Sequence, residues 1–165
     1  VLIIDEINRA NLSRVFGELM YLLEYRSAEV PLAAGESFTI PENVRLIGTM
    51  NTADRSIALV DHALRRRFAF LQLRPDMAIL DHYHNKNGTG FDTSGLVVAL
   101  QSVNAQIGDP HYEIGISYFL RKDIAICMQD VWEMEIEPYL DEFFYDQPDK
   151  VMAFRWNTIG SSILT

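Results

Sequence analysis

The sequence contains very little cysteine, since Cys127 is the single one among 165 residues. One thiol cannot form a disulfide within the chain, which excludes a small disulfide-stapled secreted domain. No apolar run is long enough to span a bilayer, and nothing resembles a signal peptide. We therefore expect a protein of the reducing cytoplasm with no membrane partner, and Cys127 lies in an apolar stretch typical of a core.

Lysine is absent from residues 1–74, where all nine basic side chains are arginine. That part also holds nine acids and is neutral, whereas residues 75–165 hold 14 acids and five bases and carry the net charge of −9. Arginine is suited to bidentate contacts with phosphate or carboxylate groups. The acidic second part argues against broad nucleic-acid contact there, because phosphate binding relies on basic patches. We predict a domain boundary at "RPD", between residues 74 and 75.

The chain also lacks an initiator methionine and a phosphate-binding glycine loop. It begins inside an apolar run, and "NKNGTG", at residues 85–90, lacks the lysine and hydroxyl that follow the last glycine of such a loop. We therefore expect a segment of a longer protein, in which "NKNGTG" is an ordinary surface turn.

Four aliphatic residues, "VLII", open the chain and are followed directly by Asp5 and Glu6. Such a run is typical of a strand that is buried on both faces of a parallel sheet. Ligands of open α/β sheets bind at the carboxyl ends of the strands, so the two acids are candidates for metal and water chemistry. The alternative is a strand that simply ends in a polar turn.

The rest of the chain predicts an α/β fold of parallel strands followed by a mostly helical part. The expected elements up to the boundary are a helix over 11–25 capped by Asn11, a hairpin of 30–32 with 38–40, a buried strand over 44–51, a helix over 56–68 capped by Ser56, and a strand over 68–73. Beyond the boundary we expect a helix over 94–107, capped by Thr93 or Ser94, and a helical stretch over 128–144 that Pro138 breaks or restarts.

Three of these segments stand in the order found in a family of nucleotide-hydrolysing proteins. "VLIIDE" resembles the Walker B strand of AAA+ proteins, "LIGTMN" the sensor-1 strand, and "ALRRRF" the segment that bears the arginine finger. The resemblance implies the second half of an AAA+ core at residues 1–74 and a helical lid at residues 75–165. It also implies that the Walker A loop precedes Val1, so that the chain alone is inactive although the full-length protein is an NTPase.

A narrower resemblance is to the GTPase subunit of McrBC-type restriction systems, which act on modified cytosine. It is carried by "IIDEINRANLS", "MNTADRS", "VDHALRRRF", "YEIGISYF" and "IEPYLDEFFYD", and it weakens between Asp76 and Gly95. It implies a motor of a modification-dependent DNA restriction system that hydrolyses GTP or ATP with Mg²⁺. The implied partners are further copies in a homo-oligomeric, hexameric ring, an McrC-like nuclease subunit, and DNA bound by other domains.

The resemblance assigns chemical roles to three residues at the strand ends. Asp5 is expected to hold Mg²⁺ through water, because this ion prefers oxygen ligands and keeps its hydration. Glu6 is the expected general base, since beyond the end of the strand its carboxylate can reach an attacking water. Asn51 is expected to position that water or the γ-phosphate through its amide.

Four further residues receive roles from the resemblance. Asp54 and Arg55 are expected to order the nucleotide-binding, water-positioning loop or to bridge to a neighbouring subunit, and a local salt bridge is the alternative. Arg66 and Arg67 are the two candidates for the arginine that reaches the adjacent subunit's nucleotide. Their alternative is a solvated helix end, where positive charge is favoured.

The lid departs from the family pattern, because Glu113 and Ile116 stand where a polar or cationic residue is expected. Arg121 is either a substitute for the lid sensor or a surface residue. Two other functions remain open, a protein-remodelling AAA+ ATPase and a non-hydrolysing interaction module that docks through its acidic lid. The sequence does not decide between guanine and adenine nucleotides.

Overall fold

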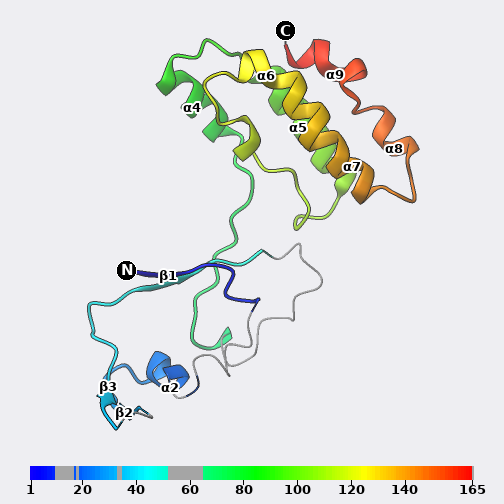
Figure 1. Ribbon diagram of the computed structural model, residues 1–165. Helices are drawn as coiled ribbons and strands as arrows, with labels where there is room; N and C mark the ends of the chain where they lie inside the picture. The colour runs from blue at the N-terminus through cyan, green and yellow to red at the C-terminus, as the bar shows by residue number, and fades with distance from the viewer. Residues whose placement is uncertain (10–16, 18, 33–34, 52–64, 165) are drawn as a thin grey trace. The chain divides into compact units, whose positions relative to one another are not determined.

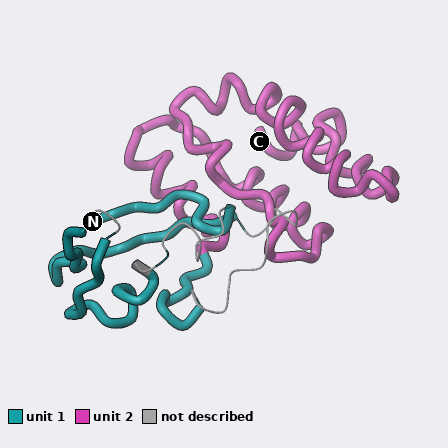
Figure 2. Tube along the Cα trace, turned by 60° about the horizontal axis from the view of Figure 1, so that its bottom comes forward, with its two compact units in different colours: residues 1–72 teal, residues 73–165 magenta. Residues whose placement is uncertain are grey.

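The chain folds as two compact units, Val1–Gln72 and Leu73–Thr165 (Figures 1 and 2). The computed structural model describes residues 1–9, 17, 19–32, 35–51 and 65–164. The division between the units lies close to the boundary predicted between residues 74 and 75.

The first unit contains a two-stranded parallel sheet made of β1 (Leu2–Ile4) and β4 (Leu46–Gly48) (Figure 1). The strands pair in register, with Ile4 opposite Gly48. Both strands therefore end at the same edge, as the prediction of parallel strands requires. Whatever follows Ile4 and Gly48 in the sequence is brought together at this edge.

The predicted burial of β1 on both faces is wrong for this chain. The side chains of Leu2 and Ile3 are 51% and 64% exposed. Ile4 is the β1 residue that packs against a small apolar cluster around Ile7 and Met20. Burial on both faces requires a layer of helices on each side of a sheet, and this cluster reaches only one end of the strand.

The strand predicted over residues 68–73 does not form. Leu71 and Leu73 in this segment are 88% and 94% exposed. A strand exists only through the hydrogen bonds that it exchanges with a neighbour, and apolar composition alone does not supply them. Among the described residues of this unit, no strand pairs with the segment.

The remaining elements of the first unit are a helix and a hairpin. The helix predicted over 11–25 is described only in its last part, as α2 (Leu19–Glu24), because Asn11 and its neighbours lie outside the described residues. The predicted hairpin is confirmed, since β2 (Val30–Pro31) pairs antiparallel with β3 (Ser37–Phe38).

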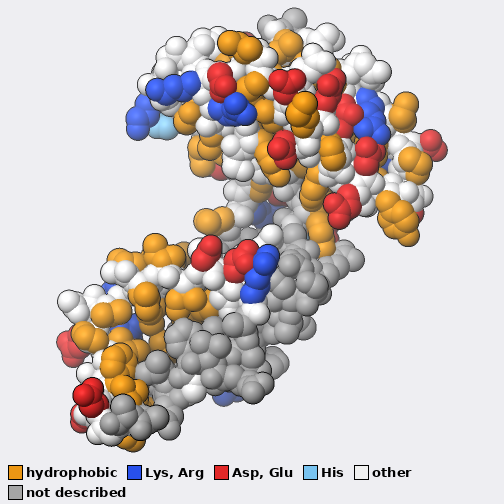
Figure 3. Space-filling model, in the orientation of Figure 1, with side chains coloured by type: hydrophobic (Ala, Val, Ile, Leu, Met, Phe, Trp, Pro, Cys, Tyr) orange, Lys and Arg blue, Asp and Glu red, His pale blue; other side chains and the backbone are white. Residues whose placement is uncertain are grey.

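The second unit is helical, and α5 packs against α9 within it. In chain order its elements are α4 (Ala78–Asn87), α5 (Ser94–Ile107), the 3₁₀ turn η1 (Ser117–Phe119), α6 (Ile124–Val131), the π-helical segment η2 (Trp132–Ile136), α7 (Glu137–Phe143), α8 (Asp149–Met152) and α9 (Trp156–Ile163). Acidic side chains are spread over the face of this unit that Figure 3 presents. None of the described helices has the length and apolar character needed to cross a membrane.

Helix α5 confirms the prediction for residues 94–107. Leu96, Leu100 and Val103 recur at helical spacing, and all three side chains are fully buried. The helix thereby presents one apolar face to the core of the second unit.

The N-cap position of α5 is Thr93, one of the two residues predicted, but its side chain does not cap the helix. The Thr93 hydroxyl donates to the carboxylate of Asp81 in α4 instead of to the helix. Asp92 accepts the Ser94 backbone N–H at 2.9 Å and so satisfies one of the free donors of the first turn. A carboxylate one residue earlier therefore does the work expected of the hydroxyl.

One continuous helical run joins α6, η2 and α7, so Pro138 does not break the helix (Figure 1). Pro138 lies in the first turn of α7, which is the restart that the sequence predicts as the other outcome. The backbone at Ile136 keeps right-handed helical angles, φ −80° and ψ −49°. Proline lacks an N–H, and its ring crowds the carbonyl four residues earlier, which is that of Met134. The π segment places a wider turn at this point, which opens the α-helical hydrogen bonding where the ring needs room.

The second unit has a large apolar core of its own. Trp132 is fully buried, and its indole N–H donates to the Phe154 carbonyl at 2.8 Å. The core extends from Leu80 in α4 to Ile163 in α9, so it draws on helices along the whole unit. The described residues that form this core all belong to the second unit.

Helix α4 was not predicted. Its buried residues are Leu80 and His84, and the two ring nitrogens of His84 contact the Thr89 hydroxyl at 2.9 Å and the Phe119 carbonyl at 3.1 Å. One aliphatic and one histidine side chain give almost no apolar periodicity, so this helix leaves little signal in the sequence. It ends at Asn87 and is followed by Gly88, with φ +60°, so the first residues of "NKNGTG" are helical rather than a turn.

Candidate functional site

The chain leaves β1 as a turn that folds over the end of β4. The Glu6 N–H donates to the Thr49 hydroxyl at 3.2 Å, and the Ile7 N–H donates to the Thr49 carbonyl at 2.8 Å. The same hydroxyl donates to the Asp5 carboxylate. Thr49 therefore fixes the acidic pair to the neighbouring strand.

Glu6 adopts a left-handed backbone conformation, with φ +50°, and among the described residues it is the only non-glycine with a positive φ. This conformation costs an L-residue about 1–2 kcal/mol. Regular strand alternation would direct Glu6 away from Asp5, but β1 ends at Ile4 and the backbone turns at Glu6. A role for Glu6 in activating water requires that the strand has ended before it. The structure meets this condition.

The carboxylate of Glu6 forms an ion pair with Arg9 inside the turn. The turn is closed by the Arg9 N–H, which donates to the Glu6 carbonyl at 2.9 Å. The two side chains are 41% and 58% exposed, so solvent screens the pair and it contributes little to stability. Glu6 can exchange this partner for a ligand at little cost.

Gly48 leaves room for the turn after β1 to pack against the sheet. Ile7 is buried, and a Cβ added at Gly48 would lie 2.9 Å from its Cδ1 atom. A larger residue at position 48 would therefore displace Ile7 and, with it, the turn that carries Glu6.

Asn51 lies just beyond Thr49, at the same edge as the acidic pair. The Asn8 amide donates to the Asn51 carbonyl at 3.3 Å, which ties the β1 turn to the segment after β4. The side-chain carbonyl of Asn8 is buried and accepts no hydrogen bond within the described structure. The structure therefore brings Asp5, Glu6 and Asn51 to one edge, as their positions in the sequence predict.

The three consecutive arginines have different surroundings. Arg67 pairs with Glu24 of α2, at 2.7 Å, and its side chain is only 18% exposed. The Arg65 guanidinium lies over the Phe70 ring, 5.8 Å from its centroid. Arg66 is exposed and forms no ion pair with the described residues. The two finger candidates thus differ, because Arg67 is anchored within its own unit and Arg66 is not.

Two predicted site residues, Asp54 and Arg55, lie outside the described residues, as does the predicted helix over 56–68 up to position 64. In the lid, Arg121 forms a bidentate pair with Asp123, with Nε–Oδ1 and Nη2–Oδ2 distances of 3.0 and 2.9 Å. This hydrogen-bonded pair lowers the pKa of the Asp123 carboxyl. The guanidinium is engaged locally, and a sensor role for Arg121 stays a prediction.

The oxygen atoms at the strand edge fit one mode of magnesium binding. Among the described residues, no three Asp, Glu, His or Cys side chains lie together as a metal cluster. Asp5 supplies an exposed carboxylate and Thr49 a neighbouring hydroxyl. Mg²⁺ commonly binds one or two carboxylates together with substrate phosphates and retains several waters. The edge therefore suits a Mg²⁺ that arrives with a nucleotide rather than a protein-caged metal.

Known proteins match both parts of the chain. The family described as "AAA domain (dynein-related subfamily)" matches residues 1–68, and the family described as "McrB, alpha-helical lid domain" matches residues 95–152. Over 98% of its length, the chain is 36% identical to the type IV methyl-directed restriction enzyme EcoKMcrB subunit of Escherichia coli strain K12. The chain belongs to the McrB-like AAA+ proteins.

A second relative aligns with a smaller part of the chain. Over 42% of its length, the chain is 33% identical to the type II restriction enzyme BsuMI component YdiS of Bacillus subtilis strain 168. The alignments cover 40% of the E. coli protein and 25% of the B. subtilis protein, so the chain spans less than half of either relative. The McrB-like fold is, as predicted, a partial α/β AAA+ core followed by a helical lid.

Thr49 is the residue at this McrB-like site that sequence reasoning missed. It has no charge and belongs to no metal-binding or catalytic pattern, although it stands between the second strand and Asn51. A hydroxyl directly after a strand that runs parallel to an acid-bearing strand is the signal that would have identified it.

Proposed function

We propose that this chain is part of the nucleotide-hydrolysing motor of a modification-dependent DNA restriction system, acting on GTP or ATP with Mg²⁺. The observation that carries the proposal is the arrangement at the shared end of β1 and β4, where Thr49 holds Asp5 and Glu6 side by side. The restriction enzymes among its relatives support the biological setting.

Asp5 would hold the metal ion through water. The Thr49 hydroxyl engages the Asp5 carboxylate and fixes its direction, while the remaining lone pairs face solvent at the exposed edge. Bound Mg²⁺ supplies positive charge next to the β- and γ-phosphates. Replacing the carboxylate by an amide would remove the charge that attracts the ion.

Glu6 would act as the general base and Asn51 as a neutral positioning group. The turn directs Glu6 past the end of β1, and its weak ion pair with Arg9 leaves the carboxylate able to accept a proton from water. An amide next to the same edge can both donate to and accept from the attacking water.

We favour Arg66 over Arg67 as the arginine that acts on a neighbouring subunit's nucleotide. Withdrawal of Arg67 would break its pair with Glu24, whereas Arg66 has no ion pair to give up among the described residues. This role requires a homo-oligomeric ring, which we take to be a hexamer. Asp54 and Arg55 would order the loop between Asn51 and the arginines.

The family supports a proposal for the wider assembly. We propose an McrC-like nuclease subunit as the partner, DNA contact through other domains of the full-length protein, and a cytoplasmic location consistent with a single cysteine. We also propose that the chain of residues 1–165 has no NTPase activity by itself.

The test compares three variants of the full-length protein. Glu6→Gln should keep nucleotide binding while hydrolysis falls by about 10²-fold or more, as the loss of a general base predicts. Asp5→Asn should weaken nucleotide binding only when Mg²⁺ is present. Glu36→Gln, an exposed change in the hairpin turn, should alter neither. Unchanged turnover in Glu6→Gln would remove Glu6 from the mechanism, and an absence of nucleotide binding in the wild type would favour an interaction module.

A further inference from the structure

Three half-buried aromatic rings form one cluster on the second unit. The centroid of the Phe143 ring in α7 lies 5.3 Å from that of Tyr112 and 6.4 Å from that of Tyr139. All three rings pack against the core of the unit, and part of each stays accessible to solvent. We call these three rings the aromatic surface.

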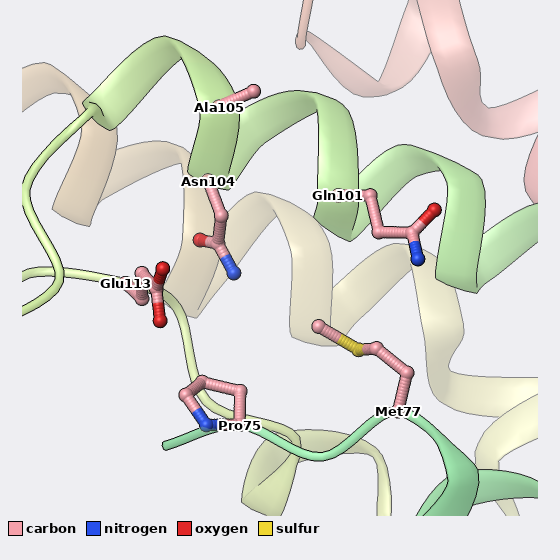
Figure 4. Close-up of a pocket in the computed structure, with 6 residues that line it drawn as sticks. All are labelled: Pro75, Met77, Gln101, Asn104, Ala105 and Glu113. Carbon is pink, nitrogen blue, oxygen red and sulfur yellow. The ribbon is translucent and has the colours of Figure 1, made fainter.

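Two anchors hold the loop that carries Tyr112. The Tyr139 hydroxyl donates to the Tyr112 carbonyl at 2.6 Å. Further along the loop, Asn104 of α5 accepts the Ile114 N–H through Oδ1 at 2.7 Å and donates to the Ile114 carbonyl through Nδ2 at 3.2 Å. Figure 4 shows the Asn104 side chain, one of those that line a pocket, pointing from α5 towards this loop. The aromatic surface is therefore formed in advance, and a ligand does not have to order it.

Two carboxylates border the aromatic surface. Glu142 is exposed on α7, and Asp109 lies in the loop after α5. Neither forms an ion pair with the described residues, although one oxygen of Asp109 accepts the His111 N–H at 3.0 Å. The pKa of Tyr139 rises from 10.0 to about 12, chiefly through burial, and the charges of Asp109 and Glu142 contribute to the rise. Both carboxylates therefore act electrostatically on one ring of the surface.

A ring beside the aromatic surface already holds a cation. The Lys150 ammonium lies over the Phe144 ring, 5.4 Å from its centroid, and Phe144 packs edge to face with Phe143 at 4.8 Å. The face of an aromatic ring carries negative charge density, so it attracts cations within about 6 Å. The rings and the two unpaired carboxylates both favour a positively charged ligand.

The charge of this part of the chain indicates where such a cation comes from. Residues 75–165 hold 14 acids and five bases, so they repel nucleic acid and attract a basic polypeptide. A second copy of this chain is a poorer partner, because each copy carries a net charge of −9. Arginine suits the surface better than lysine, since its planar guanidinium stacks on rings and offers parallel N–H donors to a carboxylate.

We propose that the aromatic surface, together with Asp109 and Glu142, binds an arginine side chain from a basic segment of another polypeptide. The guanidinium packs against the Tyr112 and Phe143 rings, and Glu142 accepts its N–H groups. This interaction goes beyond nucleotide hydrolysis and does not depend on it.

The experiment measures fluorescence anisotropy of a labelled synthetic peptide that carries three arginines separated by glycines, titrated with the full-length protein. A matched peptide has citrulline, which keeps the shape of arginine without its charge, at the same positions. The arginine peptide should bind more tightly than the citrulline peptide by about tenfold or more. Tyr112→Leu and Glu142→Gln should each weaken the arginine peptide by about 2- to 5-fold and leave the citrulline peptide unchanged.

Tyr145→Leu and Glu135→Gln are the matched controls, because they make the same changes at exposed positions outside the aromatic surface. Both should leave the affinity for the arginine peptide unchanged. Equal losses in the controls would overturn the proposal, since they would show a general attraction to an acidic unit.

Equal wild-type affinities for the arginine and citrulline peptides would also overturn the proposal. An unchanged peptide affinity in Glu142→Gln, together with a changed oligomeric state in sedimentation, would assign the surface to a second copy of this chain instead. If circular dichroism shows that Tyr112→Leu misfolds, Glu142→Gln and the comparison of the two peptides decide.

Discussion

The two units of this chain are built in opposite ways. The second unit encloses a continuous core from Leu80 to Ile163 around the fully buried Trp132. In the described part of the first unit, Ile7 and Met20 form a small buried cluster with a few half-buried neighbours, Leu22 and Val30 are buried outside it, and apolar strand residues are exposed. The first unit instead concentrates polar groups at one strand edge.

The residues proposed to carry the chemistry therefore differ from the residues that stabilise the fold. Most described residues of the proposed site are exposed, so changing them removes few packing contacts. The interior residues of the second unit contact no substrate in the proposed mechanism but carry most of the buried apolar surface. We therefore expect site variants of the first unit to change turnover, and core variants of the second unit to change the free energy of unfolding.

The largest expected effect is on turnover and belongs to Arg66. In the full-length protein, Arg66→Ala should reduce hydrolysis by about 10³- to 10⁵-fold, because an arginine finger stabilises the charge of phosphoryl transfer. Nucleotide binding and melting temperature should stay unchanged, because Arg66 is exposed. Arg67→Ala should instead lower the melting temperature, because it removes the ion-pair partner of Glu24.

Mixing distinguishes action across a subunit interface from a role within one subunit. Arg66→Ala subunits mixed with Glu6→Gln subunits should recover activity. Some interfaces in the mixed rings then join an intact Glu6 from one subunit to an intact Arg66 from its neighbour. A flat mixing curve with normal ring assembly would rule out the trans-acting role for Arg66.

The next effect is on stability and compares two leucines. Leu100 is fully buried in α5, and Leu71 is 88% exposed in the first unit. Leu100→Ala should lower the free energy of unfolding by about 2–5 kcal/mol, whereas Leu71→Ala should change it by no more than about 0.5 kcal/mol. Urea denaturation followed by circular dichroism measures both, and equal losses would contradict the contrast between the units.

A smaller loss is expected where α5 and α9 approach each other. A Cβ added at Gly95 would lie 2.1 Å from the Ser162 carbonyl oxygen and 3.0 Å from the Ile163 Cα, and backbone atoms cannot turn away as a side chain does. Gly95→Ala should therefore destabilise the second unit by about 1–3 kcal/mol, although alanine normally favours a helix. Gly115→Ala is the control, because its nearest contact is the Ser117 hydroxyl at 3.9 Å. An unchanged melting temperature for Gly95→Ala would mean that α5 and α9 can move apart at little cost.

The smallest expected effect concerns Tyr139, whose hydroxyl donates to the Tyr112 carbonyl at 2.6 Å. Tyr139→Phe should cost about 1 kcal/mol in the free energy of unfolding. Burial raises the pKa of Tyr139 from 10.0 to about 12, so the folded state disfavours the phenolate. This group's contribution is complete below pH 10 and is lost as the pH rises towards 12. Melts between pH 9 and 12 should show a shallower decline for Tyr139→Phe than for the wild type, and parallel declines would exclude Tyr139 as the source.

Local patterns in the sequence were enough to predict some elements. The apolar spacing of α5 gave its bounds, because a helix forms its hydrogen bonds within itself. Asp5 and Asn51 could be assigned to one edge because each stands at the carboxyl end of a predicted strand, and strands that run parallel end together.

Other features depend on residues distant in the chain and could not be predicted. The segment 68–73 has the composition of a strand but no pairing partner among the described residues. His84 is buried because Thr89 and Phe119 satisfy its ring nitrogens, which its helix does not reveal by spacing. The restart of the α-helix at Pro138 was predicted, but the π segment before it depends on how the helix accommodates the proline ring, which no spacing in the sequence shows.

The left-handed backbone at Glu6 sets a limit for protein engineering. Glycine adopts φ +50° freely, so a library selected for heat tolerance alone would enrich Glu6→Gly and gain up to the 1–2 kcal/mol that the conformation costs. The same substitution deletes the carboxylate on which the proposed chemistry depends. At this position, the substitution that raises thermal stability therefore lowers turnover. Stabilising mutations should leave residue 6 unchanged and be sought among the helices of the second unit.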